Sequence, residues 1–222
     1  MLNDLSSIEI RVLGSLIEKE ITTPEYYPLT LNALVNACNQ KNNRDPVVAF
    51  READVARTVE MLRDKKLVFA VTGAGIRVPK YRQHLTETLN LPREETAILC
   101  LLMLRGAQTV GELRGRSAPL HSFAGLSDVQ TVLDSLSTKE NREPLVRMLS
   151  RLPGQKEARY AHLLSGEPAS VNPADTTKPE RATLQVRADN ERIAALEAEV
   201  RALRAAVETL QEQLEGFKKQ FE

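Results

Sequence analysis

The chain has 222 residues, enough for one large domain or for two small domains with an appendage. Its 30 basic residues balance its 30 acidic residues, which excludes the global basic field typical of nucleic-acid-binding proteins and leaves only a local patch for such binding. Apolar residues make up 42% of the chain but aromatic residues only 4%, so the core must be aliphatic.

The cysteines and the apolar runs favour a reducing, cytoplasmic location. Cys38 and Cys100 lie far apart in apolar helical runs without a CxxC motif, which is typical of buried, reduced thiols. No basic stretch precedes an apolar run near residue 1, and the longest apolar run, 97–104, is too short to span a bilayer. We therefore expect a cytoplasmic protein that does not contact membranes.

The sequence contains a weak internal repeat, and its first copy lies near residue 1. Residues 5–23 align without gaps on residues 91–109, and both segments predict a helix. Ser6 with Glu9 three residues later forms a capping-box signature, and Pro92 suits the first turn of the second helix. The matched pairs are Leu5 and Leu91, Glu9 and Glu95, Leu13 and Leu99, Leu16 and Leu102, and Thr23 and Thr109.

The repeat continues with a second helix, a third helix and a hairpin in each half. The second helices are expected at 30–38 and 109–116. The third helices carry apolar stripes with i, i+4, i+7 spacing, formed by Val55, Val59 and Leu62 and by Val129, Leu133 and Leu136. The hairpins pair residues 67–72 with 76–81 around Gly73-Ala74-Gly75, and 145–149 with 159–164. Three helices followed by a hairpin is the winged-helix order.

The sequence thus predicts a mainly α fold with small β wings. We expect two tandem winged-helix domains at 1–88 and 89–166, a flexible linker at 167–182 and a C-terminal coiled-coil helix at 183–222. The linker is rich in Ser, Pro, Ala and Thr, and its prolines forbid a continuous helix.

The last segment carries apolar residues at alternating spacings of three and four. Its first three a positions are β-branched and its first three d positions are Leu, a combination that favours a parallel dimer. A single amphipathic helix folded back on the body is the alternative, but such helices show a wider apolar face than this narrow seam. The predicted dimerisation residues are Ile193, Leu196, Val200, Leu203, Val207, Leu210 and Leu214.

Five segments in the body of the chain are distinctive: YPLTLNAL (27–34), NQK (39–41), NRDPV (43–47), RVPKYR (77–82) and ELRGRS (112–117). Together they resemble the YceH-like family of uncharacterised bacterial proteins. The resemblance covers about residues 3–167. It implies two tandem winged-helix domains in a bacterial cytoplasm and no established activity. The C-terminal seam lies outside this resemblance and is interpreted from its own pattern.

We find no catalytic constellation in the sequence. His84, His121 and His162 are isolated from one another, and no HExxH, P-loop, GxGxxG or GxSxG motif is present. A surface or capping role for each histidine is therefore expected. We predict that the protein is not an enzyme and holds no metal or cofactor.

The predicted third helices argue against ordinary major-groove binding, which the winged-helix fold would otherwise suggest. The outer face of the third helix in the first half carries three acidic residues and one basic residue. The outer face of the third helix in the second half carries no basic residue. Neither face is favourable beside phosphates. The outer residues are Ala53, Asp54, Arg57, Glu60, Met61 and Asp64 in the first half, and Ser127, Thr131, Asp134, Ser135 and Thr138 in the second.

The first hairpin and the loop before the third helix favour nucleic acid instead. Residues 65–86 contain five bases and no acid, and the amide-rich loop at 39–46 adds two more cations. The structural alternatives are a hairpin edge protected by lysines and a loop that satisfies its own backbone. The predicted nucleic-acid-binding residues are Lys41, Arg44, Lys65, Lys66, Arg77, Lys80 and Arg82.

Two functional hypotheses remain open. The first is a regulator of double-stranded DNA that binds through the first hairpin and gains avidity from dimerisation. The second is an adaptor that binds a protein partner through the acidic, Met-containing face of the third helix.

The apolar seam predicts that the full chain is a homodimer and that a fragment ending near Glu167 is a monomer. Changing Leu203 to Asp should dissociate the dimer, because an unpaired buried charge costs several kcal/mol. Light scattering measures both states. A full-length monomer at tens of micromolar would refute the coiled coil.

Overall fold

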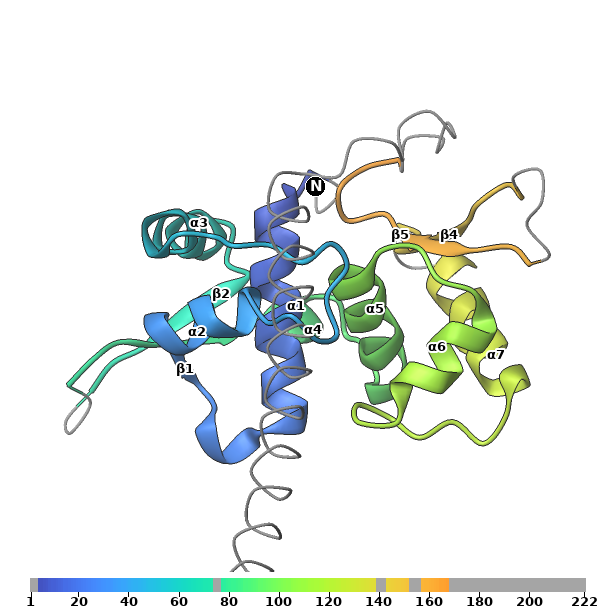
Figure 1. Ribbon diagram of the computed structural model, residues 1–222, viewed down its shortest axis with the longest axis horizontal. Helices are drawn as coiled ribbons and strands as arrows, with labels where there is room; N and C mark the ends of the chain where they lie inside the picture. The colour runs from blue at the N-terminus through green and yellow to red at the C-terminus, as the bar shows by residue number, and fades with distance from the viewer. Residues whose placement is uncertain (1–3, 74–76, 139–142, 152–156, 168–222) are drawn as a thin grey trace, which may run out of the picture. The chain divides into compact units, whose positions relative to one another are not determined.

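The computed structural model describes residues 4–73, 77–138, 143–151 and 157–167 (Figure 1). These residues belong to one compact unit, which is mainly helical with two small antiparallel sheets. The predicted coiled coil at 183–222, and the predicted linker apart from Glu167, lie outside the described residues. In the described part of the chain, no helix is long and apolar enough to cross a membrane.

The first half begins with a helix whose cap is the predicted one. The Ser6 hydroxyl accepts a hydrogen bond from the Glu9 N–H, and the Glu9 carboxylate accepts one from the Ser6 N–H. Thr30 caps the second helix through its hydroxyl. The elements are α1 (Ser7–Thr22), η1 (Pro24–Tyr26), β1 (Leu29–Thr30), α2 (Leu31–Cys38), α3 (Glu52–Asp64), β2 (Val68–Val71), β3 (Lys80–Gln83) and α4 (Leu85–Thr88).

The sheet of the first half has the strand order β1-β3-β2. Leu29 lies opposite Tyr81, and Val71 lies opposite Lys80. The expected strand at 76–81 is therefore wrong at its start, because β3 begins only at Lys80. Pro79, directly before it, has no N–H to donate to the ladder, so the paired region starts after the proline.

The second half repeats this order of elements. Its elements are α5 (Arg93–Arg105), α6 (Val110–Ser117), α7 (Leu126–Thr138), β4 (Val146–Met148) and β5 (Tyr160–His162). Hydrogen bonds from Leu149 N to Arg159 O and from Leu163 N to Leu145 O extend the β4–β5 pairing to the predicted hairpin ends. Gln108 exchanges two backbone hydrogen bonds with Tyr160, at 3.0 and 2.8 Å. Gln108 thereby takes the place beside β5 that β1 takes beside β3.

The core is one continuous, mostly aliphatic cluster shared by both halves, with Phe123 and Tyr160 among its buried residues. The apolar stripes predicted on α3 and α7 are buried within it. Cys38 and Cys100 are free and buried, as predicted, and burial raises the pKa of the Cys38 thiol to about 11.

Helix α1 lies at the centre of this core, between α2 and α3 on one side and α5 on the other (Figure 1). Every residue of α1 from Glu9 to Glu18 is buried. Gly14 marks the close approach to α5: a Cβ atom there would lie 2.9 Å from Leu104 Cδ2 and 3.3 Å from Met103 Cβ. The absence of a side chain at Gly14 therefore sets the distance between the two helices.

This close approach predicts opposite effects for the same substitution at two helical glycines. Gly14→Leu should lower the free energy of unfolding by about 1–3 kcal/mol, because the core has no room for the side chain. Gly115→Leu on α6, where a Cβ atom would meet nothing within 4 Å, should raise it by about 0.5–1 kcal/mol through helix propensity. Denaturant unfolding measures both, and equal effects would contradict the proposed role of Gly14.

Candidate functional site

Arg44, one of the residues predicted to bind nucleic acid, points into the protein. Its guanidinium donates to the Glu18 carboxylate at 2.9 and 2.6 Å and to the Ala37 carbonyl at 2.9 Å. The Arg44 side chain is fully buried. Turning it outward would leave the buried charge of Glu18 with only the longer, 3.5 Å contact to Lys19, at a cost of several kcal/mol. Arg44 therefore has to be removed from the predicted binding set.

The rest of the loop before α3 mostly satisfies its own backbone. Asn39 donates to the Phe50 carbonyl and accepts from the Phe50 N–H, at 2.9 and 2.8 Å. Arg11 on α1 donates to the carbonyl of Pro46 at 2.6 Å. These contacts favour the structural interpretation of this amide-rich segment. Lys41 is the exception, since it is exposed and forms no ion pair with any described residue.

The other predicted cations gather at the first hairpin, which we call the basic hairpin (residues 65–83). Lys80 and Arg82 lie on the same face of β3, because they are two residues apart in a strand. The Arg82 guanidinium carbon lies 5.7 Å from the centre of the Phe69 ring, opposite it on β2, in a cation–π contact. With the residues that the structure describes, Lys66, Arg77 and Lys80 form no ion pair.

Two cations of the basic hairpin are partly neutralised. Lys65 Nζ lies 2.7 Å from the buried Glu9 carboxylate. Burial raises the pKa of Glu9, but hydrogen bonds from Lys65 and Ser6 outweigh this and hold its pKa below the usual value. Arg82 lies 3.3 Å from Glu87. Because Glu87 follows directly after the acid-free segment 65–86, the sequence pattern missed this pair.

The predicted acids lie on the outer face of α3, but two of them are paired: Asp54 with Arg51 at 2.8 Å and Glu60 with Arg63 at 2.6 Å. Glu60 and Asp64 are exposed, and Met61 between them keeps 43% of its surface exposed. One residue predicted on the outer face of α7 is placed differently, since Ser135 donates a 2.7 Å hydrogen bond to the buried Glu95. Glu95 is the repeat counterpart of Glu9, so a buried first-turn acid occurs in both halves.

The histidine expectation also needs one correction. His162 is partly buried on β5, and burial lowers the pKa of its ring to about 4. It is therefore neutral near pH 7 rather than a titrating surface group. Among the residues that the structure describes, no group of His, Cys, Asp and Glu side chains is placed to hold a metal ion.

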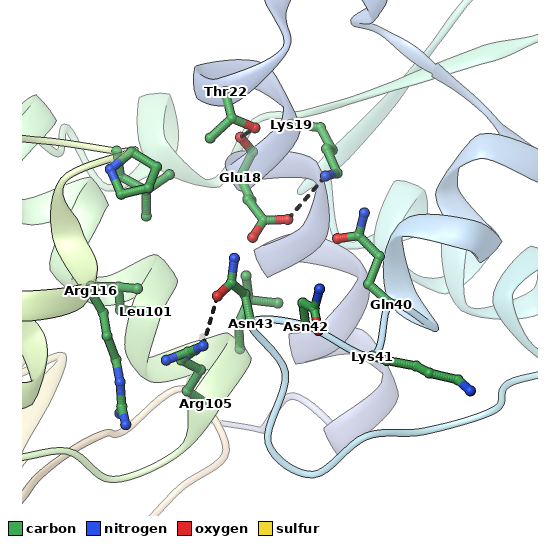
Figure 2. A pocket seen from close by; sticks show the side chains of 13 residues that line it. Glu18, Lys19, Thr22, Gln40, Lys41, Asn42, Asn43, Leu101, Arg105 and Arg116 are labelled. Carbon is green, nitrogen blue, oxygen red and sulfur yellow. Dashed lines mark hydrogen bonds and ion pairs between the residues drawn. The ribbon is translucent and has the colours of Figure 1, made fainter. Parts of the chain in front are cut away.

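A cavity of about 400 Å³ that no sequence pattern indicated opens between the halves (Figure 2). The end of α1, the loop before α3, the end of α5 and the end of α6 each supply part of its wall. Because these segments meet only in the folded chain, no spacing along the sequence could reveal the cavity. Its polar lining includes Lys19, Gln40, Lys41, Asn43, Arg105 and Arg116. We call it the cationic pocket.

Comparison with known proteins establishes the family. Residues 5–155 match the family model of a protein of unknown function, DUF480. A UPF0502 protein from Geobacter sulfurreducens is 53% identical over 218 residues, 98% of each chain. One from Geobacter metallireducens is 54% identical over 219 residues, again 98% of each chain, and one from Opitutus terrae is 49% identical over 187 residues, 83% of this chain and 81% of its own.

The chain therefore belongs to the DUF480 family, an uncharacterised bacterial family. This confirms the resemblance found in the sequence. The similarity also extends further than the predicted range of about 3–167, because the Geobacter relatives match 98% of this chain.

The buried Arg44–Glu18 pair predicts a large effect on stability. Arg44→Ala should lower the free energy of unfolding by about 3–5 kcal/mol, because Glu18 would stay buried with only its 3.5 Å contact to Lys19. Lys41→Ala, in the same loop but exposed, should change it by no more than about 0.5 kcal/mol. Denaturant unfolding compares the two variants. A stable Arg44→Ala protein with weakened nucleic-acid binding would restore the predicted surface role.

Proposed function

We propose that this DUF480 protein is a non-enzymatic DNA-binding regulator of the bacterial cytoplasm, built from two winged-helix domains. The order of elements supports the winged-helix assignment. In each half three helices precede a hairpin, and a short extended segment before the second helix pairs with the last strand of that hairpin. This is the arrangement of helices and wing in winged-helix domains.

The charge of the basic hairpin carries the proposal. Phosphate contacts supply most of the affinity of proteins for duplex DNA. Lys66, Arg77 and Lys80 form no ion pair with described residues and are available for such contacts. In contrast, the outer face of α3 carries Asp64, which would repel the phosphates that line a groove, and its Arg63 is already paired with Glu60 at 2.6 Å. We therefore propose that the hairpin, and not α3, holds the duplex.

This mode of binding positions the protein but reads little sequence. Contacts to phosphates fix orientation without reporting which bases are present, unless the hairpin also enters a minor groove. The proposed C-terminal dimer would bring two basic hairpins to one duplex and raise the avidity of a weak single contact.

One observation favours a second candidate function, an adaptor that binds another protein. Met61 keeps 43% of its surface exposed on the acidic face of α3. Methionine is common on surfaces that bind protein partners. A partner with a basic rim around an apolar pocket would fit this face.

The proposal predicts the salt dependence of DNA affinity. Replacing Arg77, Lys80 and Arg82 together with Ala should flatten the slope of log affinity against log salt by about 2 units per bound chain, because the contacts of the unpaired Arg77 and Lys80 are lost and Arg82 is already paired with Glu87. Fluorescence anisotropy with a labelled duplex at several salt concentrations measures this slope.

Arg57→Ala on α3 is the control for this experiment. It removes one exposed cation from a helix where Glu60 and Asp64 already oppose its field, so it should change the slope less than the triple variant. Duplex affinity no better than millimolar at low salt would reject DNA binding and favour the adaptor. Loss of binding in Arg57→Ala, with the triple variant unaffected, would place the contact on α3.

A further inference from the structure

The cationic pocket is built by both halves of the chain and has no role in the proposed DNA contact. Lys19 and Lys41 come from the first half, and Arg105 and Arg116 come from the second (Figure 2). Its volume of about 400 Å³ lies within the range of natural small-molecule sites, which is about 300–1,000 Å³.

The pocket carries an excess of positive charge. Its four cations face one lining carboxylate, Glu18, and that carboxylate already accepts two short hydrogen bonds from the buried Arg44. Lys41 forms no ion pair with a described residue, and Lys19 lies 3.5 Å from the same Glu18. The charge of Glu18 is therefore shared between Arg44 and Lys19 and cannot neutralise the rest of the pocket.

The two arginines are held in place but keep free donors. Asn43 Oδ1 accepts a 2.7 Å hydrogen bond from Arg105 (Figure 2), and Gln108 Oε1 accepts a 2.8 Å bond from Arg116. Glu112 lies 3.5 Å from Arg116 and also 3.1 Å from Arg159. A guanidinium has five N–H donors, so most donors of each arginine remain for a ligand.

The arginines also repel each other. Burial lowers the pKa of Arg105, and the nearby charge of Arg116 lowers it further. An anion between the two guanidinium groups would relieve this repulsion and would accept hydrogen bonds from both.

The pocket also has an apolar part. Its apolar wall is formed by Leu101, Leu104 and Leu120, which are at most 6% exposed and which we call the leucine floor. Pro119 also lines the pocket. Lysines and arginines alone would suit a bare inorganic ion. Buried leucines next to them suit a ligand that joins a charged group to an apolar or ring-shaped body.

We propose that this pocket binds a small organic phosphate, with its phosphate groups at Arg105 and Arg116 and its organic body against the leucine floor. Phosphate fits better than a single carboxylate, because Arg105 and Arg116 lie near enough to repel each other and guanidinium groups pair with phosphate in a bidentate manner. The ligand would join the loop before α3 to α5 and α6. It would thereby stabilise the packing of the two halves, since it binds only the folded arrangement.

Isothermal titration calorimetry and thermal unfolding of the full chain test this proposal, with pyrophosphate, adenosine diphosphate and citrate as probes. Adenosine diphosphate should bind one per chain and raise the Tm, and pyrophosphate should bind more weakly because it lacks the organic body. Citrate, which has similar charge but no phosphate, should bind most weakly. Citrate binding as tightly as pyrophosphate would overturn the phosphate assignment, and pyrophosphate matching adenosine diphosphate would overturn the role of the leucine floor.

Variants locate the site. Arg105→Gln and Arg116→Gln should each weaken adenosine diphosphate binding about tenfold or more, as loss of a charge-assisted hydrogen bond does. Arg114→Gln is the matched control, because it removes the same charge from α6 at a residue that does not line the pocket. Equal affinity in all three variants, or no binding of any phosphate to the native chain, would refute the proposal.

The pocket and the basic hairpin can be separated in the same experiments. The Ala triple variant at Arg77, Lys80 and Arg82 should keep its affinity for adenosine diphosphate, because none of these residues lines the pocket. Loss of adenosine diphosphate binding in that triple variant would mean that the phosphate binds at the hairpin, and would overturn the pocket assignment.

Discussion

The packing of α1 against α5 is the constraint on which the rest of the described structure depends. At Gly14 the helices approach so closely that a Cβ atom would lie 2.9 Å from the side chain of Leu104. Because α2 and α3 already cover α1 elsewhere, α5 completes its burial, and every residue from Glu9 to Glu18 lies inside the protein. A helix buried in this way cannot keep a solvated polar face. Each charged side chain on it then needs a partner from the protein itself.

The charged groups of α1 determine how the neighbouring segments fold. Glu18 is paired by Arg44 from the loop before α3, and Glu9 is paired by Lys65 directly after α3. Arg11 donates to the carbonyl of Cys38, the last residue of α2, and to the carbonyl of Pro46 within that same loop. The distinctive NRDPV segment is therefore explained by the buried charge on α1, which requires a partner of opposite charge. Its arginine, which resembles a phosphate ligand in the sequence, holds the loop against α1.

Local sequence signals were sufficient to predict most elements but not the site. The Ser6–Glu9 capping box and the apolar stripes act within one or two helical turns, so a short stretch of sequence contains the whole signal. The pair of Arg44 with Glu18 joins residues 26 positions apart, and only the tertiary fold brings them together. The same is true of the cationic pocket, whose four wall segments are separate in the chain. The predicted start of β3 at residue 76 is wrong because the strand begins at Lys80, after Pro79, which has no N–H to donate to the ladder.

Although the net charge of the chain is zero, its cations gather at two separate places, the basic hairpin and the cationic pocket. Glu9, which pairs with Lys65 of the basic hairpin, and Lys19, which lines the cationic pocket, stand ten residues apart on α1. That separation is about 15 Å along a helix, whereas salt screens exposed charges beyond about 8–10 Å. A ligand in the pocket would therefore have little direct electrostatic effect on the hairpin. Any influence of one site on the other would have to pass through α1, the element that both sites contact.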